Sequence, residues 1–223
     1  PRICLTGEIF VRRDDLSRQN ITAVLADRGF AAVCSPVAEW VHYCDFLWER
    51  NLAQSPLYTN LGGRLAAYLK ARFTGKTERR IKSILSRSGL VHDDPIDVRS
   101  IIDGAIPDVN PNLTCETILT VGAALTEIVS HACGVIAIGP FGCMPNRLSE
   151  AILTRTMVRD RRLRIDPTNN QIRAALTQIE DLPFLAIESD GSPFPQLINA
   201  KLETFLLRAE RLHREMEAAR ASA

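Results

Sequence analysis

Residues 134–145 read GVIAIGPFGCMP, an apolar run followed by a loop rich in glycine and proline. An apolar run of this length, bounded by Gly and Pro, predicts a buried strand that stops abruptly. In open α/β sheets, ligands bind beside the loops that leave the carboxyl ends of the strands. The thiol of Cys143 is therefore a candidate ligand or redox group, with Pro140, Phe141 and Gly142 shaping the loop around it. The alternative is an incidental thiol in a generic loop.

The amino-terminal part of the chain predicts a strand–helix–strand unit. Residues 2–7 and 30–34 are apolar runs, and the short helical stripe between them ends at Gly29. Strands joined in this way pair in parallel through a right-handed crossover. A fourth strand is predicted at 183–187, followed by a long amphipathic helix at 194–216.

Helical spacing dominates the stretch between the second and third strands. It covers residues 37–48, 62–73, 76–88 and 97–105, with a predicted break at Gly75. This is too much helix for one crossover, so we interpret residues 37–106 as a helical insertion. The sequence therefore predicts a single Rossmann-like α/β domain over residues 1–223. Its parallel sheet of about four strands is flanked by helices, with the insertion between strands two and three.

The composition is that of an ordinary soluble globular protein, with 46% hydrophobic residues and a net charge of +1. This balance gives no electrostatic reason to expect nucleic acid or a membrane surface as a partner. No apolar run approaches the roughly 18–20 residues that span a bilayer. The six cysteines form no CxxC pair, so we expect reduced thiols and a cytoplasmic location. The chain begins with Pro1, and we expect it to be a fragment of a longer polypeptide.

Several polar residues compete with Cys143 as functional candidates. The carboxylates of Glu8, Glu188 and Asp190 follow predicted strands and are candidate catalytic groups, although such carboxylates more often cap helices or bind backbone amides. The arginines between 155 and 164 predict a solvated face, with docking of an acidic partner as the alternative. For three other cysteines we expect small buried side chains, and these are Cys4, Cys34 and Cys44.

Five segments together resemble a known family. They are Thr6-Gly-Glu8 with Ile-Phe-Val-Arg12, Ser35-Pro-Val-Ala-Glu-Trp40, Leu119-Thr-Val-Gly122, Gly139-Pro-Phe-Gly-Cys-Met-Pro145 and Ile187-Glu-Ser-Asp-Gly191. These five segments resemble segments that occur in the same order in the 2-hydroxyacyl-CoA dehydratase D-component family. They look closest to the carboxyl-terminal region of long CoA-substrate-specific enzyme activases. The resemblance runs from about residue 2 to about residue 215.

The resemblance implies a Rossmann-like domain that supplies one cysteine to an iron–sulfur cluster at a domain interface. Cys143 would be that ligand for a [4Fe–4S] or double-cubane cluster in the full-length parent, with the other ligands upstream of this chain. An ATP-dependent activase would deliver the electron, and an acyl-CoA would be the substrate class. Cys115 falls where the family has a Gly-Gly-Glu-type loop, which hints at a second ligand. For the isolated fragment we expect no activity and no stoichiometric cluster.

Two other readings stay open beside the cluster domain. In one, the domain is a non-catalytic module that docks the activase or a partner subunit. In the other, it is a Rossmann domain for a small ligand, in which Cys143 is incidental. The acyl substrate and the oligomeric state do not follow from the sequence.

Overall fold

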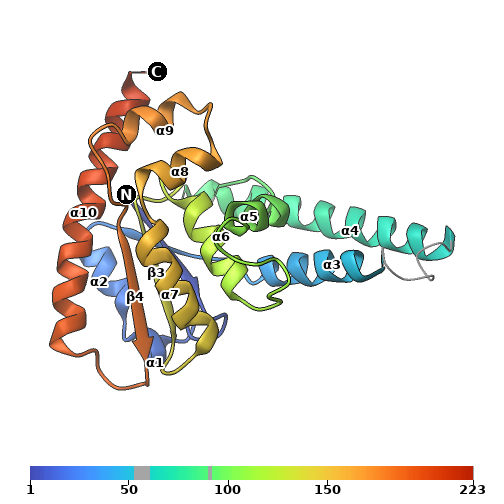
Figure 1. Ribbon diagram of the computed structural model, residues 1–223, viewed down its shortest axis with the longest axis horizontal. Helices are drawn as coiled ribbons and strands as arrows, with labels where there is room; N and C mark the ends of the chain where they lie inside the picture. The colour runs from blue at the N-terminus through green and yellow to red at the C-terminus, as the bar shows by residue number, and fades with distance from the viewer. Residues whose placement is uncertain (53–60, 90–91, 223) are drawn as a thin grey trace. The chain divides into compact units, whose positions relative to one another are not determined.

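The computed structural model describes residues 1–52, 61–89 and 92–222, and Figure 1 draws the others as a thin grey trace. The chain divides into two compact units. Residues 1–35 and 99–223 form the first unit, and residues 36–98 form the second. The second unit covers most of the segment interpreted above as a helical insertion.

One parallel sheet forms the centre of the first unit. Its strands are Arg2–Gly7 (β1), Ala31–Cys34 (β2), Gly134–Pro140 (β3) and Phe184–Ser189 (β4). The order across the sheet is β2-β1-β3-β4, and this confirms the predicted α/β fold with a parallel sheet of four strands. Because the strand order reverses between β1 and β3, the carboxyl ends of these two strands border the topological switch point. Open α/β sheets bind their ligands at that point.

Helices cover both faces of this sheet. Figure 1 shows α2 and α10 on one side, and α6 and α7 on the other. Both α7 and α10 contact β3 and β4, while α6 contacts β1. The helices that lie wholly or mainly in the first unit are α1 (Asp15–Arg18), α2 (Ile21–Asp27), α5 (Val98–Ala105), α6 (Thr117–Glu127), α7 (Met144–Thr156), α8 (Arg159–Ile165), α9 (Asn170–Ala175) and α10 (Gln196–Ala221).

The two central strands are buried on both faces, as expected for a sheet covered by helices on both sides. On the α10 face, a Cβ added to Gly134 would lie 2.7 Å from the ring of Phe205 and 3.0 Å from Ile3. This close contact seats α10 against the sheet and explains why the apolar run at β3 begins with a glycine.

Two long helices make up most of the second unit. They are α3 (Ala38–Leu52) and α4 (Leu61–Leu85), and a short 3₁₀ turn (η2, Ser86–Ser88) follows α4. The break predicted at Gly75 is wrong, because α4 runs through it without interruption. One glycine weakens a helix by roughly 1 kcal/mol relative to alanine, which is too little to end a helix of this length.

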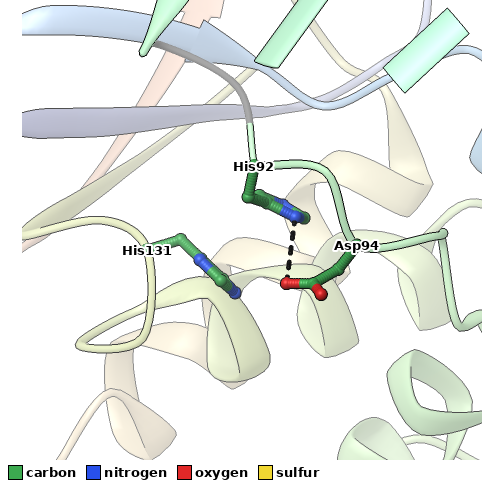
Figure 2. Close-up of side chains that lie close together, drawn as sticks. All are labelled: His92, Asp94 and His131. Atoms are coloured by element: carbon green, nitrogen blue, oxygen red, sulfur yellow. Dashed lines mark ion pairs between the residues drawn. The ribbon is translucent and has the colours of Figure 1, made fainter. Parts of the chain in front are cut away.

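Polar contacts hold the segment after α4 within the second unit. Nε2 of His42 lies 3.1 Å from Oε2 of Glu78, and Oε1 of Glu78 accepts a hydrogen bond from the Ile96 amide at 2.6 Å. Nδ1 of His92 lies 3.7 Å from Oδ2 of Asp94, the pair joined by a dashed line in Figure 2. The Glu78–Ile96 hydrogen bond ties this segment back to α4, and the His42–Glu78 contact joins α3 to α4.

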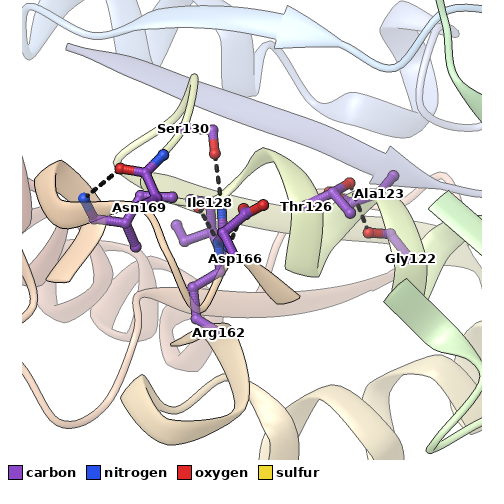
Figure 3. A network of polar contacts seen from close by, with 9 residues as sticks. Gly122, Ala123, Thr126, Ile128, Ser130, Arg162, Asp166 and Asn169 are labelled. Atoms are coloured by element: carbon purple, nitrogen blue, oxygen red, sulfur yellow. Dashed lines mark hydrogen bonds and ion pairs between the residues drawn. The ribbon is translucent and has the colours of Figure 1, made fainter. Parts of the chain in front are cut away.

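Two arginines of α8 are buried, so the prediction of a solvated arginine face is wrong for Arg161 and Arg162. Arg162 is 0% exposed, and its Nε donates to the carbonyl of Ile128 at 2.9 Å. Its Nη2 donates to Ser130 Oγ and its Nη1 to Asp166 Oδ2, both at 2.6 Å (Figure 3). Arg162 therefore fixes the turn that connects α6 to β3.

Among the described helices, none combines the length and the apolar content that crossing a membrane requires.

Candidate functional site

The candidate site lies at the carboxyl ends of β1 and β3. Gly7, the last residue of β1, has a φ of +103°, and a Cβ added there would lie 2.2 Å from the carbonyl oxygen of Ile138. The next amide, that of Glu8, donates to this same oxygen at 2.9 Å. The two strands are thus held together up to the switch point, and the loops that leave them begin side by side.

Cys143 occupies the N-cap position of α7, at the end of the loop that leaves β3. Two backbone hydrogen bonds fix this loop: the Phe141 amide donates to Ser189 O at 2.9 Å, and the Cys143 amide donates to Pro140 O at 3.1 Å. Pro145 lies in the first turn, where a missing N–H group costs nothing. The prediction that Cys143 follows a buried strand and precedes a helix is confirmed.

The environment of the Cys143 sulfur differs from that of the other thiols in the first unit. The sulfurs of Cys4, Cys34, Cys115 and Cys133 each make a hydrogen bond to a side chain or a carbonyl. The Cys143 side chain makes none with any residue that the structure describes, and it is part-exposed. Burial also raises the pKa of Cys133 to about 11, which keeps that thiol protonated at neutral pH. Cys143 is therefore the thiol of this unit best placed to bind something outside it.

Exposed apolar side chains flank Cys143 on both sides. Phe141 is 77% exposed and Met144 is 71% exposed, and Phe10 in the loop after β1 is exposed as well. Single exposed apolar residues are common on protein surfaces, but these three all lie on the two loops that border one switch point, and we refer to them together as the apolar rim. Contact with another protein surface would cover them.

Cys115 lies near the same helix start. Its sulfur donates to Thr117 Oγ1 at 3.2 Å, and Thr117 Oγ1 donates to the carbonyl of Pro145 at 3.1 Å. Two hydrogen bonds thus link Cys115 to the first turn of α7, which Cys143 caps. Within the part of the chain that the structure describes, no group of three or more potential metal ligands includes either thiol.

The three candidate carboxylates are all engaged by neighbouring groups. Oε2 of Glu8 accepts hydrogen bonds from the amides of Phe10 and Val11, at 3.1 Å and 2.7 Å, and so shapes the loop after β1. Glu188 lies 3.5 Å from Nη1 of Arg147 on α7. Each of these contacts organises a loop or helix at the carboxyl edge of the sheet.

Asp190 accepts a hydrogen bond from the Ser192 amide at 2.8 Å, and this bond holds the pKa of Asp190 below its usual value. A carboxyl group with a lowered pKa is a poor general base near neutral pH, because it binds a proton weakly. From the sequence, these carboxylates could be catalytic groups or could bind backbone amides and shape loops. Their geometry supports the second role.

Three buried polar side chains at this edge were missed in the sequence. Thr6, Arg12 and Asn146 are at most 4% exposed. Several of their polar atoms have no hydrogen-bond partner among the described residues. These are Thr6 Oγ1, Asn146 Oδ1 and Nδ2, and Arg12 Nε and Nη2. In the sequence these residues look like ordinary polar residues. Only their position could have indicated them: Thr6 is near the end of a strand, Arg12 is in the loop that follows it, and Asn146 is at a helix start.

A cluster of the iron–sulfur type takes up to four protein thiolates. Cys143 supplies one sulfur, on a part-exposed residue at the edge of the sheet, with Cys115 nearby, so the described residues do not provide a complete ligand set. They fit a cluster shared with thiolates from elsewhere, and they do not fit a cluster held by this unit alone.

Comparisons of the chain with protein-family models, with curated proteins and with solved structures gave no match. The family resemblance described above therefore stays a prediction that rests on the sequence segments themselves.

Proposed function

We propose that the first unit is the cluster-carrying domain of an ATP-driven electron-transfer system of the 2-hydroxyacyl-CoA dehydratase type. Cys143 would supply one thiolate ligand at an interface with another domain. The observation that carries this proposal is the state of its sulfur. Cys143 is part-exposed and occupies the N-cap position of a helix at the switch point, and its sulfur makes no hydrogen bond with the described residues.

The loop around Cys143 suits a ligand that must keep its position. Backbone hydrogen bonds at Phe141 and Cys143 hold the loop against β3 and β4. Pro140 restricts the backbone conformation where the loop begins. The amino end of α7 carries a partial positive charge, and its first turn contains no acidic side chain. This end of the helix therefore favours a negatively charged sulfur.

The apolar rim of Phe10, Phe141 and Met144 would lie against the domain that contributes the remaining ligands. Apolar side chains at such a contact exclude water, and low solvent exposure is one of the factors that set the reduction potential of a cluster. When bound, the cluster would supply single low-potential electrons. The upstream part of the same polypeptide, an ATP-dependent activase and an acyl-CoA are the partners that the resemblance implies.

The test is the iron and sulfide content of the complete native polypeptide, purified without oxygen, beside its Cys143→Ser variant. Cys44→Ser is the matched control, because Cys44 is an exposed thiol on α3 and far from this loop in sequence. We expect the Cys143→Ser variant to lose most of the iron and the brown colour, and the Cys44→Ser variant to keep both. Equal iron and sulfide content in all three proteins, or a colourless wild type, would contradict the proposal.

A docking module is the second candidate function, and the same apolar rim favours it. In that case the native polypeptide contains no iron, and Phe141→Ser and Met144→Ser weaken its binding to a partner subunit. The iron measurement therefore separates the two candidates.

A further inference from the structure

We infer that the open edge of β4 binds an extended, acidic segment of another protein as a fifth strand of the sheet. β4 comes last in the order β2-β1-β3-β4, so among the described residues it pairs with a strand on one side only. An edge strand presents a row of backbone N–H and C=O groups, and a further strand can bind to them. Several peptide-binding domains recognise their partners in this way. The inference does not rest on the proposed cluster, because it uses no thiol.

The backbone hydrogen bonds of β4 show which of its groups point away from the sheet. In a parallel ladder, alternate residues bond to the neighbouring strand, and the residues between them point the opposite way. The carbonyl of Pro183 accepts a hydrogen bond from the Val135 amide at 3.0 Å. The carbonyl of Ser189 accepts one from the Phe141 amide at 2.9 Å. The odd-numbered residues thus bond towards β3, and the outward N–H and C=O groups belong to Phe184, Ala186 and Glu188.

Leu182, just before β4, marks the place where the open edge begins. By the same alternation its backbone groups point outward, and both of them are bonded. Its amide donates to the carbonyl of Met157 at 2.8 Å, and its carbonyl accepts a hydrogen bond from Nη2 of Arg208 at 3.3 Å. No described residue reaches the outward backbone groups of β4 itself in this way. The open edge therefore starts at Phe184 and continues along β4.

A cavity of about 420 Å³ lies at these same residues of β4. Its lining combines residues 184–186 with side chains of α7 and α10, the two helices that flank β4 in Figure 1. The apolar part of the lining comes from residues 184–186 and from Ala200 and Phe205 of α10. Ligand pockets in proteins measure roughly 300–1,000 Å³, so the cavity has room for side chains of a strand that lies along the edge.

The charged groups that line the cavity favour an acidic partner. On α7, the carboxylate of Glu150 is already paired with Nη1 of Arg147 at 2.6 Å. On α10, Lys201 and Arg208 are both exposed, and neither forms an ion pair with a carboxylate among the described residues. The α10 side of the cavity therefore carries two positive charges without a counter-charge, and acidic side chains of a bound strand would supply it.

The same charges oppose pairing with a second copy of the chain. Two β4 strands that pair in an antiparallel way are related by a two-fold axis perpendicular to the sheet. Such an axis places α10 of one copy beside α10 of the other. Lys201 and Arg208 of both copies would then share one face, where like charges repel each other.

The spacing of the two cations indicates the pattern of the acidic segment. Lys201 and Arg208 both lie on α10, and they are separated by about 10 Å along its axis. Alternate residues of a strand project to the same face at intervals of about 6.7 Å. Acidic side chains at alternate positions of the bound strand would therefore reach both cations, because lysine and arginine side chains are long and flexible.

The experiment measures binding of a fluorescently labelled peptide to the complete chain by anisotropy. The probe is a short peptide in which glutamate and valine alternate, and the control peptide has lysine in place of each glutamate. We expect saturable binding of the glutamate peptide, and a Kd that is higher by about 10-fold or more for the lysine peptide. The absence of saturable binding, or an equal Kd for the two peptides, would overturn the inference. If the glutamate peptide does not bind and sedimentation shows a dimer, a second copy replaces it as the candidate occupant.

Methylation of the peptide amides tests strand addition without any change to the protein. In a strand bound at an edge, only alternate amides face the neighbouring strand. One peptide is methylated on its glutamate amides, and a second is methylated on its valine amides. We expect one of them to bind more weakly by about 10-fold or more, and the other to bind like the unmodified peptide. Equal binding of the two methylated peptides would contradict strand addition.

Reversing the two charges tests the acidic pattern. The variant carries Lys201→Glu and Arg208→Glu, and we expect it to bind the glutamate peptide more weakly by about 10-fold or more. The matched control carries Arg211→Glu and Arg214→Glu, which make the same change in net charge at exposed residues of α10 outside the cavity. We expect this control to bind like the wild type. Equal Kd values for the two double variants would show that the cations of the cavity do not select the partner, and would overturn the inference.

Discussion

Substituting Gly7 by alanine tests whether the close backbone contact between β1 and β3 stabilises the sheet at the switch point. Gly7 combines a left-handed φ of +103° with a backbone oxygen 2.2 Å from the position of an added Cβ. Gly29 is the matched control, because its φ is +77° but an added Cβ would meet no atom within 4 Å. Gly29→Ala therefore reports backbone strain alone, which costs roughly 1 kcal/mol.

Gly7→Ala adds a collision with the backbone of Ile138 to the same strain. Overpacking of this kind costs about 1–3 kcal/mol, and the upper part of that range applies where the obstacle is backbone and cannot rotate away. We expect Gly7→Ala to lower the free energy of unfolding by about 4 kcal/mol, and Gly29→Ala by about 1 kcal/mol. Urea unfolding followed by circular dichroism measures both values. If the two variants lie within 1 kcal/mol of each other, the close contact between the strands does not exist as described.

Two further predictions concern groups at the opposite edge of the sheet. The pKa of Cys133 is raised to about 11 by burial, so at pH 8 iodoacetamide should modify exposed Cys44 much faster, and modification of Cys133 should rise as the pH approaches 11. Equal rates at pH 8 in a mass-spectrometric time course would contradict this burial. Arg162→Met should lower the free energy of unfolding by about 3 kcal/mol, because the fully buried Arg162 makes one buried and two part-buried hydrogen bonds. Arg159→Met, at a half-exposed arginine of the same helix, should change it by less than about 0.5 kcal/mol, and similar losses for both variants would refute the role of Arg162.

The sheet could be predicted from the sequence because its strands are short apolar runs that end in Gly, Pro or Ser. The run at 134–138 and the helix that follows Cys143 are the clearest case, and both are present as β3 and α7. The same local signals failed at Gly75, because a single glycine costs only roughly 1 kcal/mol and α4 continues through it.

Burial of charged residues could not be predicted from the sequence. Arg161 and Arg162 lie in a run of arginines that has the composition of a solvated surface, yet the fold places both inside. Arg12 is fully buried while Arg13, the next residue, is exposed. These differences in burial depend on the tertiary structure, and the pattern of neighbouring residues does not predict them. Cys44, which the sequence predicts to be buried, is exposed on α3.

Only part of the candidate site could therefore be predicted from the sequence. Cys143 was found from its loop, because Pro and Gly residues around a cysteine after a strand are a local signal. The burial of Thr6, Arg12 and Asn146 became visible only with the tertiary structure, because no pattern of neighbouring residues indicates it. The hydrogen bond from Arg12 to Gly7 and the packing of Asn146 on Gly139 also appear only there.

The most direct test of the central claim is thiol footprinting of the native polypeptide before and after its iron is removed by a chelator without oxygen. Both samples are treated with iodoacetamide, and the extent of modification of each cysteine is read by mass spectrometry. A cluster ligand is protected while the metal is bound, so Cys143 should be modified only in the iron-free sample, whereas Cys44 should be modified equally in both. Equal modification of Cys143 in the two samples would contradict its assignment as a cluster ligand.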